Sequence, residues 1–213
     1  MKNIADIRKE YKLQTLLENE VAADPFVQFT KWWDDALRSE IVEVNAMTLA
    51  TVDAGAKPSA RIVLLKDFSK EGFVFFTNYD SYKGKQLAEN PKACLVLFWK
   101  ELERQVRITG IVQKVSPKES DDYFHSRPTG SQVGAAVSPQ STIIESREWL
   151  EKKYNDLEKQ TTGKIVERPG NWGGYLVKPV MIEFWQGRPS RLHDRLEYSL
   201  QENGGWRIER LAP

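Results

Sequence analysis

The fold of this chain is decided by two neighbouring stretches, Ala93-Cys94-Leu95-Val96-Leu97-Phe98-Trp99 and Arg104-Gln105-Val106-Arg107-Ile108-Thr109-Gly110-Ile111-Val112-Gln113-Lys114-Val115. Both are rich in β-branched and aromatic residues, which favour strands. A short polar break separates them, as in a hairpin. Three similar stretches precede them, over residues 46–52, 59–66 and 72–77. Five strands with short connections predict an antiparallel, mainly β meander, closed as a barrel or packed as a sandwich.

Helices are expected to flank this sheet. Asp24-Pro25 is typical of an N-cap and a first helical residue, and it precedes apolar residues at helical spacing up to about Glu40, namely Phe26, Phe29, Trp33 and Leu37. Ser116-Pro117-Lys118-Glu119 is a capping box that begins another helix, which Pro128 must end or restart. Further helices are expected within 78–92 and over 141–160, and further strands over 180–186 and 206–211.

Composition narrows the class of protein. The chain has 213 residues, with 31 Lys and Arg against 30 Asp and Glu, and this balance argues against a general nucleic-acid-binding surface. The lone Cys94 excludes a disulfide framework and a multi-cysteine metal site, and its apolar surroundings indicate a buried core thiol. No signal peptide and no membrane span are expected. We therefore expect a cytoplasmic protein with a mobile arm over residues 1–23 and a single domain over 24–213.

The most informative candidate site is the segment Ser190-Arg191-Leu192-His193-Asp194-Arg195. Arginine binds phosphate or carboxylate through paired hydrogen bonds, and imidazole exchanges protons near neutral pH. Arg191 and His193 are two residues apart, so an extended backbone would direct both side chains to one face. The pair indicates a binding site for an anionic substrate. The alternative is a solvated charged turn.

Other cations and hydroxyls suggest phosphate binding without a glycine-rich loop or a metal motif. Arg61 and Lys66 bracket an apolar strand, where strict alternation would put them on opposite faces unless one lies beyond a bulge or the strand end. Ser81-Tyr82-Lys83-Gly84-Lys85 opens a helix, where an anion is favoured. Tyr123, Arg127 and Ser131 are spaced four apart and would converge if the break at Pro128 is gentle. The alternatives are solvated strand ends and an exposed helix face.

Taken together, these segments resemble the pyridoxine (pyridoxamine) 5′-phosphate oxidases, a family of FMN enzymes. The resemblance covers nearly the whole chain and is weakest before Asp24. It is carried, in order, by Arg61–Lys66, Glu103-Arg104-Gln105-Val106, Tyr123-Phe124-His125-Ser126-Arg127-Pro128, Ser138–Ser141, Trp172-Gly173-Gly174, Ile182-Glu183-Phe184-Trp185-Gln186-Gly187, Arg191-Leu192-His193-Asp194-Arg195 and Arg210-Leu211-Ala212-Pro213.

The resemblance implies an antiparallel split β-barrel homodimer with FMN at the subunit interface. The cofactor-binding residues that it implies are Arg61, Ile62, Val63, Leu64, Lys66, Phe76, Thr77, Tyr82, Lys83, Gln105, Gln140, Ser141, Trp185 and Arg195. The substrate-binding residues that it implies are Arg8, Tyr11, Lys66, Tyr123, Arg127, Ser131, Arg191 and His193, with Arg191 and His193 as catalytic candidates. Tyr82 departs from the family, which often has arginine there.

The activity implied by the resemblance is the oxidation of pyridoxine or pyridoxamine 5′-phosphate to pyridoxal 5′-phosphate, with dioxygen as electron acceptor. Hydrogen peroxide is released, together with ammonia from the amine. The alternatives are another FMN split-barrel oxidoreductase, such as a flavin reductase or a phenazine-pathway oxidase, and a carrier of flavin or pyridoxal phosphate without turnover. Residue chemistry alone indicates only a β-barrel that binds a phosphorylated ligand.

Overall fold

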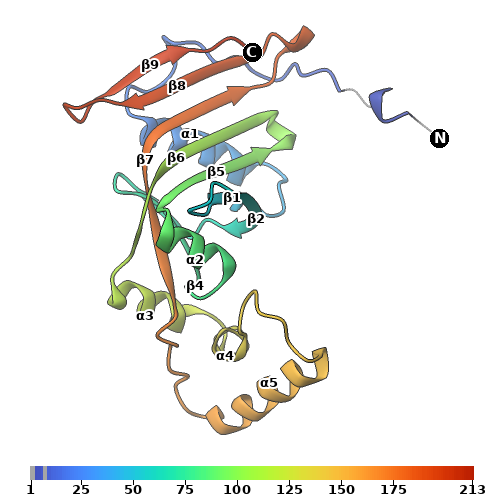
Figure 1. Cartoon of the computed structure of the whole chain (residues 1–213). Coiled ribbons are helices and arrows are strands. Elements are labelled where there is room, and N and C mark those ends of the chain that lie inside the picture. Colours follow the sequence, from blue (N-terminus) through green and yellow to red (C-terminus); the bar gives the residue numbers. More distant parts are fainter. Residues whose placement is uncertain (1–2, 7–8) are drawn as a thin grey trace.

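The computed structural model describes residues 3–6 and 9–213. Arg8, expected to contact substrate, lies outside the described residues. Figure 1 shows a long curled sheet, with β8 and β9 at one end and the helices α3, α4 and α5 at the other. The predicted class, an antiparallel split β-barrel with flanking helices, is confirmed.

The sheet has nine strands among the described residues, and every pairing is antiparallel. The order is β2-β1-β5-β6-β7-β4-β3, and β8 pairs with both β7 and β9. The strands are β1 Ala46–Val52, β2 Pro58–Leu64, β3 Asp67–Ser69, β4 Gly72–Asn78, β5 Lys92–Trp99, β6 Arg104–Lys114, β7 Trp172–Gln186, β8 Asp194–Leu200 and β9 Trp206–Arg210.

The meander prediction is wrong in part, since β4 pairs with the short β3 and with β7 rather than with β2 or β5, and β1 pairs with β5. The reason is the length of β7, of which the sequence pattern indicated only residues 180–186. Its first half pairs with β4 and its second half with β8, while β6 follows it along the other side. The register shift between Thr109 and Gly110 accompanies this change of partner. The strands β3 and β8 were not predicted.

The helices are α1 Pro25–Arg38, α2 Tyr82–Glu89, α3 Pro117–Ser126, α4 Thr129–Val137 and α5 Arg147–Thr161, with short 3₁₀ turns at Ile4–Asp6, Lys100–Leu102 and Pro189–Arg191. The Asp24 carboxylate caps α1 by accepting from the Phe26 backbone N–H at 2.7 Å, and Ser116 accepts from Glu119 N–H at 3.1 Å. Both predicted caps are thus confirmed. The last helix begins six residues later than expected, because Ser146 is its N-cap.

Helix α1 closes the main core against the sheet. Phe29 is fully buried and contacts the rings of Phe68, Phe73 and Trp99. Leu37, expected on the buried stripe, is 58% exposed. Trp32 and Ala36 are buried instead, so the buried face of α1 includes positions that the predicted spacing did not.

Cys94 is half-buried rather than a core thiol. On β5 the core side chains are Ala93, Leu95, Leu97 and Trp99, so the alternation of the strand puts Cys94 on the opposite face. Among the described residues, no helix is long and apolar enough to cross a bilayer, and no group of side chains is arranged to hold a metal ion.

Replacing Phe29 by alanine should destabilise the protein by about 3–5 kcal/mol, because the truncation opens a cavity in the aromatic core. The control is Leu37→Ala on the same helix, which should change stability by no more than about 0.5 kcal/mol since that side chain is exposed. Urea unfolding followed by tryptophan fluorescence measures both. Equal effects of the two substitutions would contradict the assigned face of α1.

Candidate functional site

A cavity of about 680 Å³ lies between β2, β4 and the helices α2, α3 and α4. We call it the cationic pocket because Arg61, Lys66, Lys83 and Arg127 all line it, and none of its described lining residues is acidic. The other lining residues that the sequence singled out are Ile62, Val63, Leu64, Phe76, Thr77, Tyr123, Ser131 and Gln140. Strand β2 ends at Leu64, so Lys66 lies beyond the strand end, as the alternation argument required.

Lys83 is buried in the first turn of α2, where Ser81 is the N-cap. Its ammonium donates to Thr77 Oγ1 at 3.1 Å, to Gln140 Oε1 at 3.2 Å and to Ser81 Oγ at 3.3 Å. All three acceptors are neutral. Burial, assisted by the charge of Arg61, lowers the pKa of Lys83 to about 8. A buried ammonium with neutral partners is suited to receive an anion.

Arg61 is oriented from β2 by neutral acceptors on neighbouring strands and on α2. One terminal nitrogen donates to Leu49 O at 3.1 Å and Thr51 Oγ1 at 2.6 Å, and the other donates to Ser59 Oγ and to Gln86 Oε1. Sequence reasoning missed these supports. The available signal was Ser59, which alternation puts on the same face as Arg61, and Thr51 is its register partner on β1.

The opposite wall is formed by α3 and the start of α4, and the predicted convergence of Tyr123, Arg127 and Ser131 is confirmed. Arg127 lies 4.8 Å over the ring of Trp172, a wall residue to which the sequence analysis gave no role. Its Nη1 is buried without a hydrogen-bond partner among the described residues. Burial also lowers the pKa of Arg127. An unsatisfied guanidinium nitrogen in a cavity marks a position for an anionic oxygen.

A second cavity, of about 380 Å³, is the arginine–histidine pocket, lined by Lys9, Glu10, Tyr11, Arg188, Ser190, Arg191 and His193. The backbone here is not extended as expected, since Ser190 and Arg191 are left-handed with φ of 55° and 62°. A 3₁₀ turn, rather than strand alternation, brings Arg191 and His193 into one pocket.

The hydrogen bonds of His193 define its chemistry. The backbone N–H of Arg188 donates to His193 Nδ1 at 3.0 Å, so the neutral ring carries its hydrogen on Nε2. Burial, together with the nearby charge of Arg191, lowers the pKa of His193. The imidazole is therefore neutral near pH 7, and it presents an N–H donor at Nε2.

Three of the predicted cofactor residues form a row beside this second pocket. Gln105, Trp185 and Arg195 are register partners across β6, β7 and β8. The ring of Trp185 lies 4.7 Å from His193, and Arg195 is paired with the buried Glu183 at 2.9 Å. None of the three lines the cationic pocket, nor do Tyr82 and Ser141.

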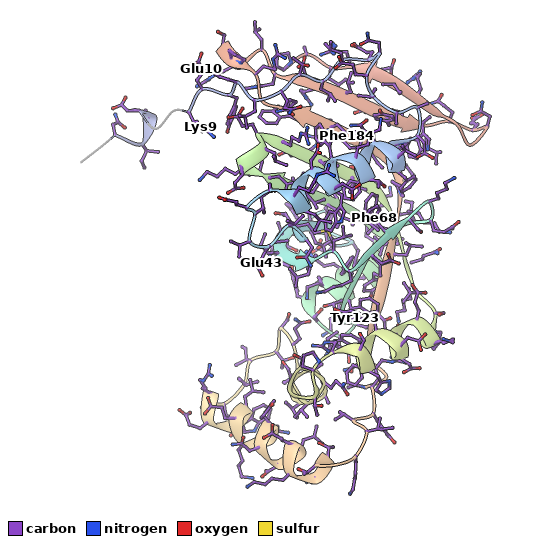
Figure 2. The ribbon with its side chains drawn as sticks, turned by 180° about the vertical axis from the view of Figure 1, so that it is seen from behind. Lys9, Glu10, Glu43, Phe68, Tyr123 and Phe184 are labelled. Carbon is purple, nitrogen blue, oxygen red and sulfur yellow. The ribbon has the colours of Figure 1, made fainter. Side chains whose placement is uncertain are left out.

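The two pockets lie at opposite ends of β7. Trp172 lines the cationic pocket and Trp185 borders the arginine–histidine pocket, and both belong to this one strand. A strand rises about 3.3 Å per residue, so the length of β7 between the two residues is roughly 40 Å. In Figure 2, Tyr123 lies near the helices, and the arm residues Lys9 and Glu10 lie toward the opposite end of the molecule.

The curled antiparallel sheet and the cationic pocket fit the class of β-barrel proteins that bind a phosphorylated ligand. Residues 33–161 match the family model described as pyridoxamine 5′-phosphate oxidase. Residues 172–213 match the model of the pyridoxine 5′-phosphate oxidase C-terminal dimerisation region. The chain belongs to the pyridoxamine 5′-phosphate oxidase family.

Relatives extend this finding over the full length. The chain is 58% identical to a pyridoxine/pyridoxamine 5′-phosphate oxidase of Nostoc punctiforme, over 100% of this chain and 99% of that protein. A solved structure of PhzG from Burkholderia lata, in complex with tetrahydrophenazine-1-carboxylic acid, has a TM-score of 0.89 at 27% identity, over 94% and 99% of the two chains. An FMN-binding protein from Nostoc punctiforme shares the fold, with a TM-score of 0.71 at 17% identity over 91% and 100% of the two chains.

Proposed function

We propose that this protein oxidises pyridoxine 5′-phosphate and pyridoxamine 5′-phosphate to pyridoxal 5′-phosphate, with FMN as cofactor and dioxygen as acceptor. Hydrogen peroxide is released, together with ammonia from the amine. The reaction serves the synthesis and salvage of vitamin B6. The observation that carries the proposal is the cationic pocket, whose four cations without an acidic neighbour suit two phosphate groups. The 58% sequence identity to the Nostoc oxidase, over the whole of this chain, supports the same reaction.

The residues of the pocket fit FMN. Arg61 and Lys83 would hold its phosphate, since both are buried or half-buried and have neutral partners only. The strand segment from Ile62 to Lys66, with Phe76 and Thr77, would line the flavin ring. When bound there, FMN would supply the acceptor for a hydride from C4′ of the substrate and the means of passing the electrons to dioxygen.

The second pair of cations would hold the substrate phosphate. Lys66 and Arg127 face the same cavity as the hydroxyls of Tyr123 and Ser131. The unpartnered Nη1 of Arg127 supplies a donor that is already desolvated. Fixing the phosphate at one end of a small substrate restricts the position of its reacting carbon, and such positioning lowers the barrier of the chemical step.

A homodimer completes the site. Gln105, Trp185, Arg195, Arg191 and His193 are too far from the cationic pocket of their own chain to share a ligand with it. A second copy can bring its arginine–histidine pocket to the cationic pocket, and the match of residues 172–213 to a dimerisation region supports this arrangement. Each site would then combine residues of both subunits.

Arg191 and His193 would act on the substrate ring as positioning and electrostatic groups. A guanidinium stays protonated, so Arg191 stabilises negative charge rather than accepting a proton. His193 presents Nε2–H, so it is suited to donate to a substrate oxygen.

We also infer that residues 24–213 form one domain, that residues 1–23 form an arm, and that the protein is cytoplasmic, which the lone Cys94 supports.

The test of the function is an oxygen-electrode assay of the purified, FMN-loaded protein with each substrate, following the product aldehyde in parallel. Oxygen uptake matched by aldehyde formation is expected with both substrates. A protein with a flavin spectrum but no oxygen uptake would instead be a carrier or an oxidoreductase for another substrate.

Affinity for FMN should fall as the pH rises through about 8, the pKa of the Lys83 ammonium. The anion binds the protonated form, which predominates below this pKa and is lost above it, so Kd should rise by up to roughly tenfold per pH unit there. Flavin fluorescence quenching from pH 6 to 9.5 measures the effect. Lys83→Met should bind FMN weakly and with a flatter profile, and an unchanged slope in this variant would disprove the assignment.

Replacing Arg191 by methionine should lower kcat by roughly 10²–10³-fold, because a charge next to the reacting ring is lost. FMN should remain bound, since Arg191 is assigned to the substrate ring and not to the cofactor. Arg207→Met, at an exposed arginine of β9, is the control and should leave turnover unchanged. Loss of flavin from the Arg191 variant would refute the assigned role.

A further inference from the structure

We infer that Glu103 is a positioning residue for the reaction, because it holds residues 9–13 of the arm over the arginine–histidine pocket. The inference deepens the proposed function and rests on it for the kinetic part of its test. Glu103 lies between the 3₁₀ turn Lys100–Leu102 and β6, and its side chain is only 2% exposed.

Both carboxylate oxygens of Glu103 are directed to the arm. Oε2 accepts from the backbone N–H of Lys12 at 2.8 Å and from that of Leu13 at 3.2 Å, while Oε1 pairs with Lys9 Nζ at 3.3 Å. Backbone amides that bind a buried carboxylate form strong, directional contacts. These contacts join sequence positions about ninety residues apart and fix the arm on either side of Tyr11.

The backbone of Glu103 is adapted to this contact. Its φ of 56° lies in the left-handed region, which disfavours residues other than glycine. The conformation is held by the strand next to it, because Gly187 N–H and Gln186 Nε2 both donate to Glu103 O, at 2.8 and 3.2 Å. A strained backbone conformation at a buried acidic residue indicates that its side chain has a function.

The segment that Glu103 holds closes the pocket with Tyr11. The Tyr11 ring lies 5.8 Å from Trp185, edge to face, and 6.0 Å from His193. It rests directly on Gly187, where an added Cβ would lie 2.7 Å from Tyr11 Cγ. Because Lys9, Glu10 and Tyr11 line the pocket with Arg191 and His193, displacing this segment would open the pocket to water.

The rest of the arm is fixed by other contacts. Leu16 N–H donates to Asp194 Oδ2 at 3.1 Å, and Arg210 binds both Leu16 O and the Glu18 carboxylate at 2.8 Å. Loss of the Glu103 carboxylate should therefore release residues 9–13 without detaching residues 16–18. The effect of a substitution should be confined to the part of the arm that covers the pocket.

The experiment compares Glu103→Gln and Glu103→Gly with a matched control, Glu101→Gln, at an exposed carboxylate two residues earlier. The glycine variant suits the left-handed backbone, so it separates loss of the carboxylate from loss of the turn. We expect KM for pyridoxamine 5′-phosphate to rise about tenfold in the glycine variant, the factor for one charged hydrogen bond, and less in the glutamine variant. FMN content should match that of the unsubstituted protein.

Trypsin cleavage after Lys9 and Lys12 is the second readout, and it does not depend on activity. Cleavage should be faster in both Glu103 variants than in Glu101→Gln. Unchanged cleavage and unchanged KM would overturn the inference while leaving the proposed function in place. If the unsubstituted protein shows no oxidase activity, the proposed function fails, and the cleavage rates alone decide whether Glu103 holds the arm.

Gly187→Ala provides an independent route to the same displacement. The added methyl group would push the Tyr11 ring away while the Glu103 carboxylate remains. A rise in KM with FMN content retained is expected here too. A normal KM in Gly187→Ala, together with a raised KM in the Glu103 variants, would show that Glu103 acts elsewhere than through the position of Tyr11, and would overturn the proposal.

Discussion

The concentration of four cations in one cavity is the constraint on which the rest of the structure depends. Burial lowers the pKa of Lys83, and repulsion from the like charge of Arg61 lowers it further. The cavity tolerates them because hydroxyls, two side-chain amides and one backbone carbonyl, rather than carboxylates, orient Arg61 and Lys83. Neutral acceptors fix the orientation of these two side chains but do not neutralise their positive charge. A bound phosphate therefore relieves a repulsion that the folded protein already contains.

Strand β7 imposes the second constraint. It is long enough to pair with β4 near the helices and with β8 at the other end, so it joins the two pockets and also keeps them apart. A continuous strand cannot fold back to bring its ends together without losing its pairing with β6. The chain therefore separates the groups that would hold phosphates from those that would act on the ring. Association of two copies is the economical way to reunite them.

Local patterns in the sequence predicted much of this structure, and long-range pairing explains what they missed. The strand over residues 46–52 and the caps at Asp24 and Ser116 depend on neighbouring residues, and all are as predicted. The pairing of β4 with β7 depends on residues about a hundred positions apart, and no local pattern reports it. The same holds for the supports of Arg61 and for the left-handed backbone at Arg191. Spacing alone indicated a phosphorylated ligand, and resemblance was needed to name it.

The acidic residues follow a pattern that explains why Arg191 is the effective cation of its pocket. At this end of the sheet Glu183 neutralises Arg195, Asp194 pairs with Arg188, and Glu103 pairs with Lys9. Arg191 makes no ion pair with any residue that the structure describes, and its charge contributes to keeping His193 neutral. A substrate ring entering here would meet one unneutralised guanidinium beside a neutral imidazole that donates. Carboxylates around the pocket, rather than in its lining, thus determine where positive charge remains available to the substrate.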